Sequence, residues 1–192
     1  MTFPKVWRIF FAVDIAPALK NQLGDFVSTL KERSKSHAIR WSRPENLHIT
    51  LQFLAEVGSD DVPTILQEVR QVVKEASHQL SFTFGKITLF PHPSRPRVIV
   101  LDITEQEGLA ELSAKIAKGI QAANYEVEEK AFKAHLTLGR IKQPKGVNLR
   151  FLADVELPIS EKVIVDEIVL FRSEPQADGS RYSLIEKISL CT

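Results

Sequence analysis

The 192-residue sequence contains a single cysteine, Cys191, and no long uninterrupted apolar run. One cysteine can form neither a disulfide framework nor a cysteine-ligated metal centre within the chain. The apolar run that begins after Arg8 is interrupted by Asp14, so we expect neither a secretory signal nor a membrane span. These absences predict a cytoplasmic protein that does not associate with the membrane.

The sequence also has no excess of charge of either sign. It carries 25 basic and 24 acidic residues and a formal net charge of +1. A binding site for a polyanion must therefore be a local patch. The hydrophobic content of 44% is ordinary for a globular protein, and no linker-like stretch divides the chain. We expect residues 1–192 to form a single bilobal domain.

Hydrophobic periodicity predicts strands and helices that alternate along the chain. The expected helices cover residues 17–35, 60–77 and 106–123. The expected strands cover residues 8–15, 39–42, 47–57, 80–90, 97–104, 125–127, 133–141, 165–174 and 181–190. This order predicts an α+β fold of mostly antiparallel sheet, with helices on its outer faces.

One short motif occurs twice. The segments NLHITLQFL at 46–54 and KAHLTLGRI at 133–141 share the pattern His-x-Thr-Leu, and each follows a helix and an extended segment. This repetition predicts two similar lobes. If a pseudo-twofold axis relates the lobes, both motifs converge on one cleft between them.

Strand geometry predicts which side chains of each motif share a face. Residues i and i+2 of a strand point the same way, so His48 lies with Thr50 and His135 with Thr137. The residues of opposite parity are apolar and should pack against helices: Leu47, Ile49, Leu51, Phe53, Ala134, Leu136 and Leu138.

Two facing imidazoles suit general acid–base catalysis near neutral pH. Two threonine hydroxyls can donate hydrogen bonds to the oxygens of a phosphate held between them. This combination favours in-line hydrolysis of a phosphodiester, because no nucleophile elbow or similar Ser or Cys motif is present. A metal site is the competing interpretation of two histidines, but it needs further ligands that the motifs do not supply.

The repeated motif resembles that of the two-histidine phosphoesterase superfamily. The segments IRWSRPENLHITLQFLAEV and FKAHLTLGRI are similar to those of the RNA 2′,3′-cyclic phosphodiesterases, also called 2′-5′ RNA ligases. Weaker similarity extends over nearly the whole chain through RIFFAVDI, RPRVIVLDI and VDEIVLFRSE. One departure is Ala134, since many members have proline before the second histidine.

The resemblance implies a central cleft, activity on a terminal 2′,3′-cyclic phosphate of RNA ends or cyclic nucleotides, and no metal or other cofactor. It implies that His48 is the general acid and His135 the general base, although the residues themselves leave this order open. Thr50 and Thr137 would hold the phosphate, and the product would be a 2′-phosphomonoester. We expect a monomer.

Other residues allow two interpretations. The guanidinium of Arg140 can neutralise a phosphate or its neighbour, or be a solvated strand end, and we include it among the phosphate-binding residues. The aromatic residues Phe10, Trp41 and Tyr182 can line the cleft or pack in the core. The cations Arg8, Arg43, Arg97, Lys130 and Lys133 can form a basic rim or be scattered surface charges. The remaining histidines, His37, His78 and His92, have no threonine partner, and we expect no catalytic role for them.

Three alternatives to hydrolysis of RNA cyclic phosphates remain open at the level of sequence. The first is a reversible 2′-5′ RNA ligase, and the second is a phosphodiesterase for another small cyclic phosphate. The third is a module that binds RNA ends without turnover. Both motifs are complete, which favours an enzyme.

Overall fold

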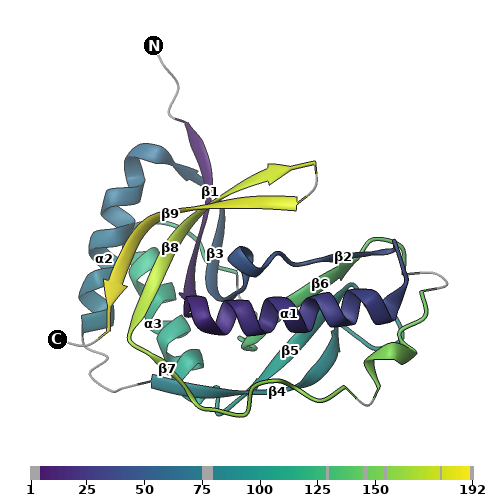
Figure 1. Cartoon of the computed structure of the whole chain (residues 1–192). Coiled ribbons are helices and arrows are strands. Elements are labelled where there is room, and N and C mark those ends of the chain that lie inside the picture. The colour runs from purple at the N-terminus through teal and green to yellow at the C-terminus, as the bar shows by residue number, and fades with distance from the viewer. Residues whose placement is uncertain are drawn as a thin grey trace.

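The computed structural model describes residues 5–74, 80–128, 130–144, 147–153, 155–177 and 179–190. His78 and Cys191 lie outside these residues. The elements along the chain are β1 (Val6–Asp14), α1 (Pro17–Ser34), β2 (Ile39–Trp41), η1 (Pro44–Asn46), β3 (His48–Gly58), η2 (Ser59–Asp61), α2 (Val62–Lys74), β4 (Leu80–Phe90), β5 (Val98–Thr104), α3 (Glu107–Ala122), β6 (His135–Ile141), η3 (Arg150–Leu152), β7 (Val163–Val165), β8 (Glu167–Gln176) and β9 (Gly179–Ser189) (Figure 1).

The nine strands form one curled sheet in the order β7-β4-β5-β6-β3-β1-β8-β9, with β2 paired to β6. All of the described pairings are antiparallel. The two motif strands, β3 and β6, are neighbours and pair through Ile49 and Leu136. This junction divides the sheet into a lobe of β1, β3, β8 and β9 and a lobe of β2, β4, β5, β6 and β7. The predicted two-lobed α+β fold is confirmed.

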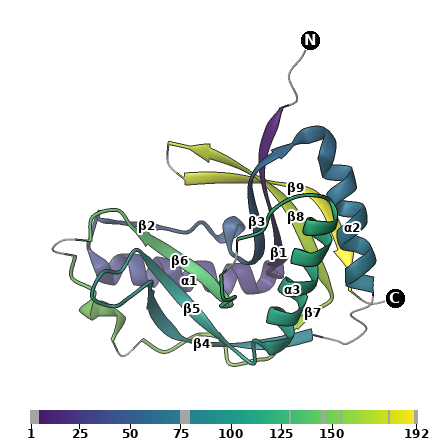
Figure 2. The ribbon, with the colours of Figure 1, turned by 180° about the vertical axis from the view of Figure 1, so that it is seen from behind.

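The helices cover the outer faces of the two lobes. Figure 1 shows α1 lying across the lobe that contains β2, β5 and β6, whereas Figure 2 shows α2 and α3 side by side against the other lobe. The apolar side chains of α1 that face inward include Leu23 and Leu30, which are fully buried. The helices α2 and α3 pack so closely at Gly119 that a side chain there would not fit: a Cβ atom would lie 2.8 Å from the Cα atom of Val69.

Two predicted elements differ from the structure. The segment 125–127 is not a strand. Its Tyr125 hydroxyl donates to Asp61 in η2 at 2.6 Å and accepts from the N–H of Gly58, the last residue of β3, at 3.3 Å. The strand β7, which the prediction included only through Val165, pairs with the start of β4. None of the described helices is both long and apolar enough to cross a lipid bilayer.

Candidate active site

A cavity of about 840 Å³ lies where the two lobes meet. The side chains of His48, Thr50, His135 and Thr137 all line it, together with Arg140. Because β3 and β6 run antiparallel around the pair Ile49–Leu136, His48 lies on the side of Thr137 and Thr50 on the side of His135. The structure therefore brings all five predicted site residues together.

The imidazole of His48 is held at both nitrogens. Its Nδ1 lies 2.7 Å from the carbonyl oxygen of Asn46, and its Nε2 lies 3.0 Å from the Thr50 hydroxyl. A carbonyl oxygen only accepts hydrogen bonds, so Nδ1 carries a proton and donates it. In the neutral ring, Nε2 is therefore the acceptor, and the Thr50 hydroxyl donates a hydrogen bond to it.

The imidazole of His135 is held in a similar way. Its Nδ1 donates to the carbonyl oxygen of Lys133, again two residues earlier, at 2.8 Å. The ring of Phe90 stacks on this imidazole, with centroids 5.6 Å apart and an angle of 14° between the planes. In both motifs the backbone carbonyl of residue i−2 fixes the tautomer, so Nε2 is the nitrogen on the side of the motif's threonine in the first motif and the nitrogen left to a substrate in the second.

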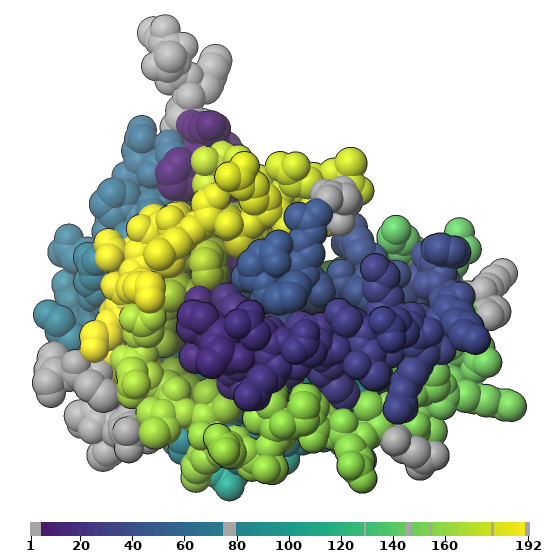
Figure 3. Space-filling model, viewed as in Figure 1, coloured from purple at the N-terminus to yellow at the C-terminus, as the bar shows by residue number. Residues whose placement is uncertain are grey.

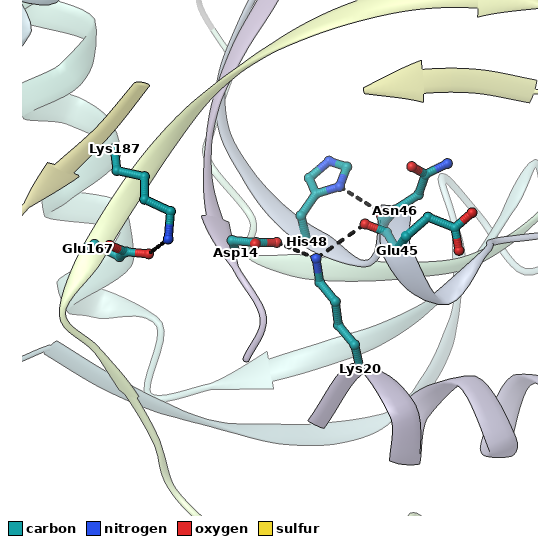
Figure 4. Close-up of polar contacts among 7 residues, drawn as sticks. All are labelled: Asp14, Lys20, Glu45, Asn46, His48, Glu167 and Lys187. Atoms are coloured by element: carbon teal, nitrogen blue, oxygen red, sulfur yellow. Dashed lines mark hydrogen bonds and ion pairs between the residues drawn. The ribbon is translucent and has the colours of Figure 1, made fainter. Parts of the chain in front are cut away.

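The short helix η1, which presents the Asn46 carbonyl to His48, is anchored from two sides. From α1, the Lys20 ammonium donates to the Glu45 carbonyl at 3.2 Å and forms an ion pair with Asp14 at 2.7 Å (Figure 4). From the β8–β9 hairpin, the Ser180 carbonyl accepts from the Asn46 amide at 3.1 Å. Figure 3 shows the segment leading into β3 lying between α1 and this hairpin. These contacts fix the position of His48 from outside its own strand.

Each motif strand contains a β-bulge at the leucine of its His-x-Thr-Leu segment. In the β1–β3 ladder, Ala12 pairs with Thr50 and Phe11 with Gln52, so Leu51 is the extra residue. In the β5–β6 ladder, Val100 pairs with Thr137 and Ile99 with Gly139, so Leu138 is the extra residue. The internal repetition seen in the sequence therefore extends to the backbone geometry.

A serine stabilises each bulge. The hydroxyl of Ser113, on α3, donates to the Leu51 carbonyl at 2.8 Å and accepts from the Gln52 amide at 2.9 Å. In the second motif, the Ser42 N–H donates to the Leu138 carbonyl at 2.8 Å, and its hydroxyl donates to the Thr137 carbonyl at 2.7 Å. These bonds satisfy carbonyl groups at the point where the strand ladder is disrupted.

The bulges reverse the alternation of side chains beyond each threonine. Phe53 was predicted to be on the buried face with Leu51, but it is 42% exposed and lines the cavity. The prediction for Phe53 was therefore wrong, because Leu51 takes an extra place in the strand. Arg140 occupies the equivalent position, five residues after its histidine, and is brought to the cavity in the same way.

Burial lowers the pKa of His48 from 6.5 to about 4. The rings of Phe10 and Tyr182 enclose the imidazole, with centroids 4.8 and 5.2 Å from its own. The hydrogen bond to the Asn46 carbonyl and the charge of Asp14 raise the pKa, but less than burial lowers it. His48 is therefore neutral at pH 7 in the empty cleft.

The cavity has a strongly basic lining in a chain of net charge +1. Its described lining residues include five arginines, Arg8, Arg40, Arg43, Arg140 and Arg181, and a single acidic residue, Glu45. Two of the five cations considered for a basic rim, Arg8 and Arg43, are thus in place. Arg97, Lys130 and Lys133 are not among the described lining residues. The chain thus has a local basic patch, which a nearly neutral protein needs if it is to bind a polyanion.

The aromatic candidates divide between core and cleft. Phe10 does both: it is only 3% exposed and packs in a small core cluster with Val169, and it also lines the cavity beside His48. Tyr182 and Trp41 line the cavity from opposite lobes. His37 and His92 are exposed and are not among the described residues that line the cavity.

Comparison with known proteins identifies the family. The profile of the family described as LigT like phosphoesterase matches residues 13–100 and 101–182. The chain belongs to the LigT-like phosphoesterase family. Among relatives of this phosphoesterase, a protein of Archaeoglobus fulgidus named RNA 2′,3′-cyclic phosphodiesterase is 32% identical over 136 residues, which cover 71% of this chain and 73% of the relative. A protein of the same name from Methanothermobacter thermautotrophicus is 29% identical and covers 95% and 98% of the two chains.

Solved structures have the same fold as this phosphoesterase. A crystal structure of a Thermus thermophilus protein superposes with a TM-score of 0.77 at 25% identity, covering 95% of this chain and 97% of that one. The structure of E. coli LigT complexed with 3′-AMP superposes with a TM-score of 0.78 at 20% identity, covering 98% and 100%. The two-lobed architecture is thus shared over essentially the whole length.

Sequence reasoning missed several residues that shape the phosphoesterase cleft. Asn46 and Lys20 position His48, and Ser113 holds the bulge beside Thr50. The contacts of Lys20 and Ser113 join elements far apart in the chain, so nothing in the local sequence marks them, whereas the Asn46 carbonyl lies only two residues before His48. Arg40 was also overlooked, although its place next to Trp41 in a short strand leading to the first motif was visible. No group of three or more His, Cys, Asp or Glu residues with metal-binding geometry occurs in the part of the chain that the structure describes.

Proposed function

We propose that this chain is an RNA 2′,3′-cyclic phosphodiesterase that hydrolyses a terminal 2′,3′-cyclic phosphate to a 2′-phosphomonoester. The observation that carries this proposal is the convergence of His48, Thr50, His135, Thr137 and Arg140 on one basic cavity. The names of the curated relatives support the same substrate. Because all five side chains come from one chain, we propose a monomer, and we place it in the cytoplasm.

The proposed reaction is a single in-line displacement. A water oxygen attacks phosphorus as His135 removes a proton from the water. The bond from phosphorus to O3′ breaks opposite the attacking water, and His48 gives its Nε2 proton to the departing oxygen. The hydroxyls of Thr50 and Thr137 donate to the non-bridging oxygens, and Arg140 supplies positive charge for the anionic substrate.

The proposed acid must take up a proton from the solvent when the substrate binds. His48 is neutral in the empty cleft, since its pKa is about 4. An anionic phosphate beside Nε2 favours the imidazolium form, and the enclosure of the ring strengthens this attraction. The low pKa therefore keeps His48 uncharged until a phosphate arrives, and the substrate itself makes the site ready to react.

Release of phosphate from 2′,3′-cyclic AMP in the presence of a phosphatase tests the proposed activity. The variants His48→Ala and His135→Ala should each lower turnover by about 10²- to 10⁴-fold, the usual size for a lost general acid or base. His92→Ala is a matched control outside the cleft and should retain the normal rate. Binding without turnover in the unmodified chain would favour an RNA-end-binding module instead.

We also propose that the reaction needs no metal ion, because each motif pairs its histidine with a hydroxyl where a further metal ligand would be expected. Dialysis against EDTA should leave the rate unchanged. Loss of activity that Zn²⁺ or Mn²⁺ restores would contradict this part of the proposal.

A further inference from the structure

Two arginines face each other across the strand pair that borders the cleft. Arg40, in β2, and Arg140, in β6, are direct partners in the antiparallel ladder. Side chains on directly opposite residues have Cβ atoms about 4.5–5.5 Å apart, and like charges in this arrangement destabilise a sheet. Both arginines line the same cavity as the two histidines.

The local structure keeps this pair together despite the repulsion. The strand β2 has only three residues, and it lies close against β6 at Gly139, where a Cβ atom would be 3.1 Å from the Trp41 ring and 3.3 Å from the Arg40 carbonyl. The bulge at Leu138 turns Arg140 toward the cavity. In the part of the chain that the structure describes, neither guanidinium has a hydrogen bond or ion pair to a carboxylate. An anion bound between the two guanidiniums would offset their repulsion and accept hydrogen bonds from the N–H groups of both.

The position of the pair relates it to the reacting phosphate. In the β5–β6 ladder Thr137 pairs with Val100 and Arg140 with Val98, so the bulge at Leu138 leaves these two residues two ladder steps apart, or about 7 Å at the usual rise per residue of a strand. A phosphate between the two guanidiniums would thus lie next to the phosphate held by the threonines and be a separate group. In an RNA end, the terminal nucleotide carries such a second phosphate at its 5′ oxygen.

We propose that Arg40 and Arg140 form a second phosphate subsite, which binds the 5′-phosphate of the nucleotide whose 2′,3′-cyclic phosphate reacts. The subsite distinguishes an RNA end, in which this phosphate is the linking phosphodiester, from a nucleoside 2′,3′-cyclic phosphate, which lacks it. This inference rests on the proposed function for the identity of the ligand. It extends that function by assigning a role to Arg40, which the motifs do not include.

The test compares two ligands that differ only in the second phosphate. Adenosine 2′-phosphate has the product's phosphate alone, and adenosine 2′,5′-bisphosphate adds the 5′ group. Binding of both is measured by calorimetry, so the result does not depend on turnover. The second phosphate should tighten binding by about 10- to 100-fold, since hydrogen bonds between charged groups contribute about 1.5–3 kcal/mol each.

The variants then assign the effect to the arginine pair. Arg40→Gln should abolish most of the advantage of the bisphosphate, and Arg40→Lys should keep part of it, because a lysine retains charge without the planar fork. Arg33→Gln removes an exposed arginine from the last turn of α1 and should keep the full advantage. The slope of log affinity against log salt for the bisphosphate should decrease by about 0.7 in Arg40→Gln, the value for one phosphate contact in a single strand.

A stability measurement separates this role from a structural one. If Arg40 and Arg140 repel each other in the empty cleft, Arg40→Gln should unfold at the same temperature as the unmodified protein or at a higher one. Equal affinity for the two ligands in the unmodified protein would overturn the proposal, and so would a bisphosphate advantage that survives Arg40→Gln. Either result would leave hydrolysis of 2′,3′-cyclic AMP, which tests the proposed function separately, unaffected.

Discussion

Binding of a phosphodiester anion in the cleft should raise the pKa of His48 from about 4 to near neutrality. The change follows from the surroundings of the imidazole. The rings of Phe10 and Tyr182 shield it from water, and a bound substrate places a negative charge beside it. Ligand binding is therefore the change to be made, and the pKa of His48 is the quantity to be measured.

The size of the shift can be worked out. A unit negative charge about 4 Å from the imidazolium, at an effective dielectric constant of about 20, contributes about 4 kcal/mol. At 1.36 kcal/mol per pKa unit, this amounts to about 3 units, which moves the pKa from about 4 to about 7. The attraction is thus just large enough to make the proposed acid protonated under physiological conditions.

The assay is an NMR titration of the His48 ring protons with and without 2′,3′-cyclic UMP, in the His135→Ala variant so that the ligand persists. Binding takes up a proton between pH 7 and pH 4, so affinity should increase by about tenfold for each unit that pH falls in this range. The His48→Asn,His135→Ala double variant should bind the ligand with no such dependence.

A bound-state pKa that remains near 4 would refute this reasoning. The ring would then be neutral in the complex at pH 7, and it could accept a proton from water but not deliver one to the leaving oxygen. In that case the roles of the two histidines would be exchanged. The pH dependence of kcat provides an independent check: with His48 as the acid, its contribution decreases above about pH 7, and with His48 as the base, it increases with pH through about 4.

Three further predictions concern stability and positioning. The pKa of His48 is lower in the folded chain than its usual 6.5, so the unfolded chain binds more protons than the folded chain between pH 6.5 and 4. Urea denaturation should therefore show that up to about 3 kcal/mol of stability is lost as the pH falls through this range, and His48→Asn should abolish this loss. Ser113→Ala should lower the free energy of unfolding by about 1–3 kcal/mol, because it leaves the Leu51 carbonyl without its buried donor; an unchanged urea midpoint would contradict this. Phe90→Ala should reduce kcat several-fold and KM little, since an aromatic contact contributes about 0.5–1.5 kcal/mol, and Phe90→Tyr should restore the rate if stacking on His135 positions the ring.

Much of the fold could be predicted from periodicity, because most elements bury one regular face. The apolar stripe of α2, with Ile65 and Val69 fully buried, gives an unmistakable helical spacing. The expected strand at 125–127 failed for a different reason. Its aromatic and β-branched residues suit a strand, but Tyr125 finds its partners in Asp61 and Gly58, which the sequence does not reveal. The strand preference of residues 125–127 is therefore outweighed by the contact of Tyr125 with a segment 64 to 67 residues earlier.

The site could be predicted only as far as strand alternation holds. Alternation correctly places His48 with Thr50 and His135 with Thr137, because these residues precede the bulges. It fails at Phe53, which follows the bulge at Leu51. A bulge depends on how a strand pairs with its neighbour, and the residues of a single strand do not determine that pairing. The contacts of Asn46 with Ser180 and of Lys20 with Glu45, which join elements remote in sequence, were hidden for the same reason.

The two bulges also explain why a repeated motif supports an asymmetric cleft. Each lobe uses a serine to hold an extra leucine, and each thereby turns the residue five places after its histidine into the cavity. That residue is an exposed aromatic ring, Phe53, in one lobe and a cation, Arg140, in the other. The backbone geometry is repeated and the side chains are not, so in the proposed mechanism the phosphate lies between matched His-Thr pairs while its surroundings differ. In one lobe the Arg8 guanidinium lies over the Phe53 ring, 5.4 Å from its centroid, and the other lobe presents the guanidinium pair proposed to bind a second phosphate. Under the proposed mechanism, this asymmetry gives the substrate one preferred orientation, which a fixed division between acid and base requires.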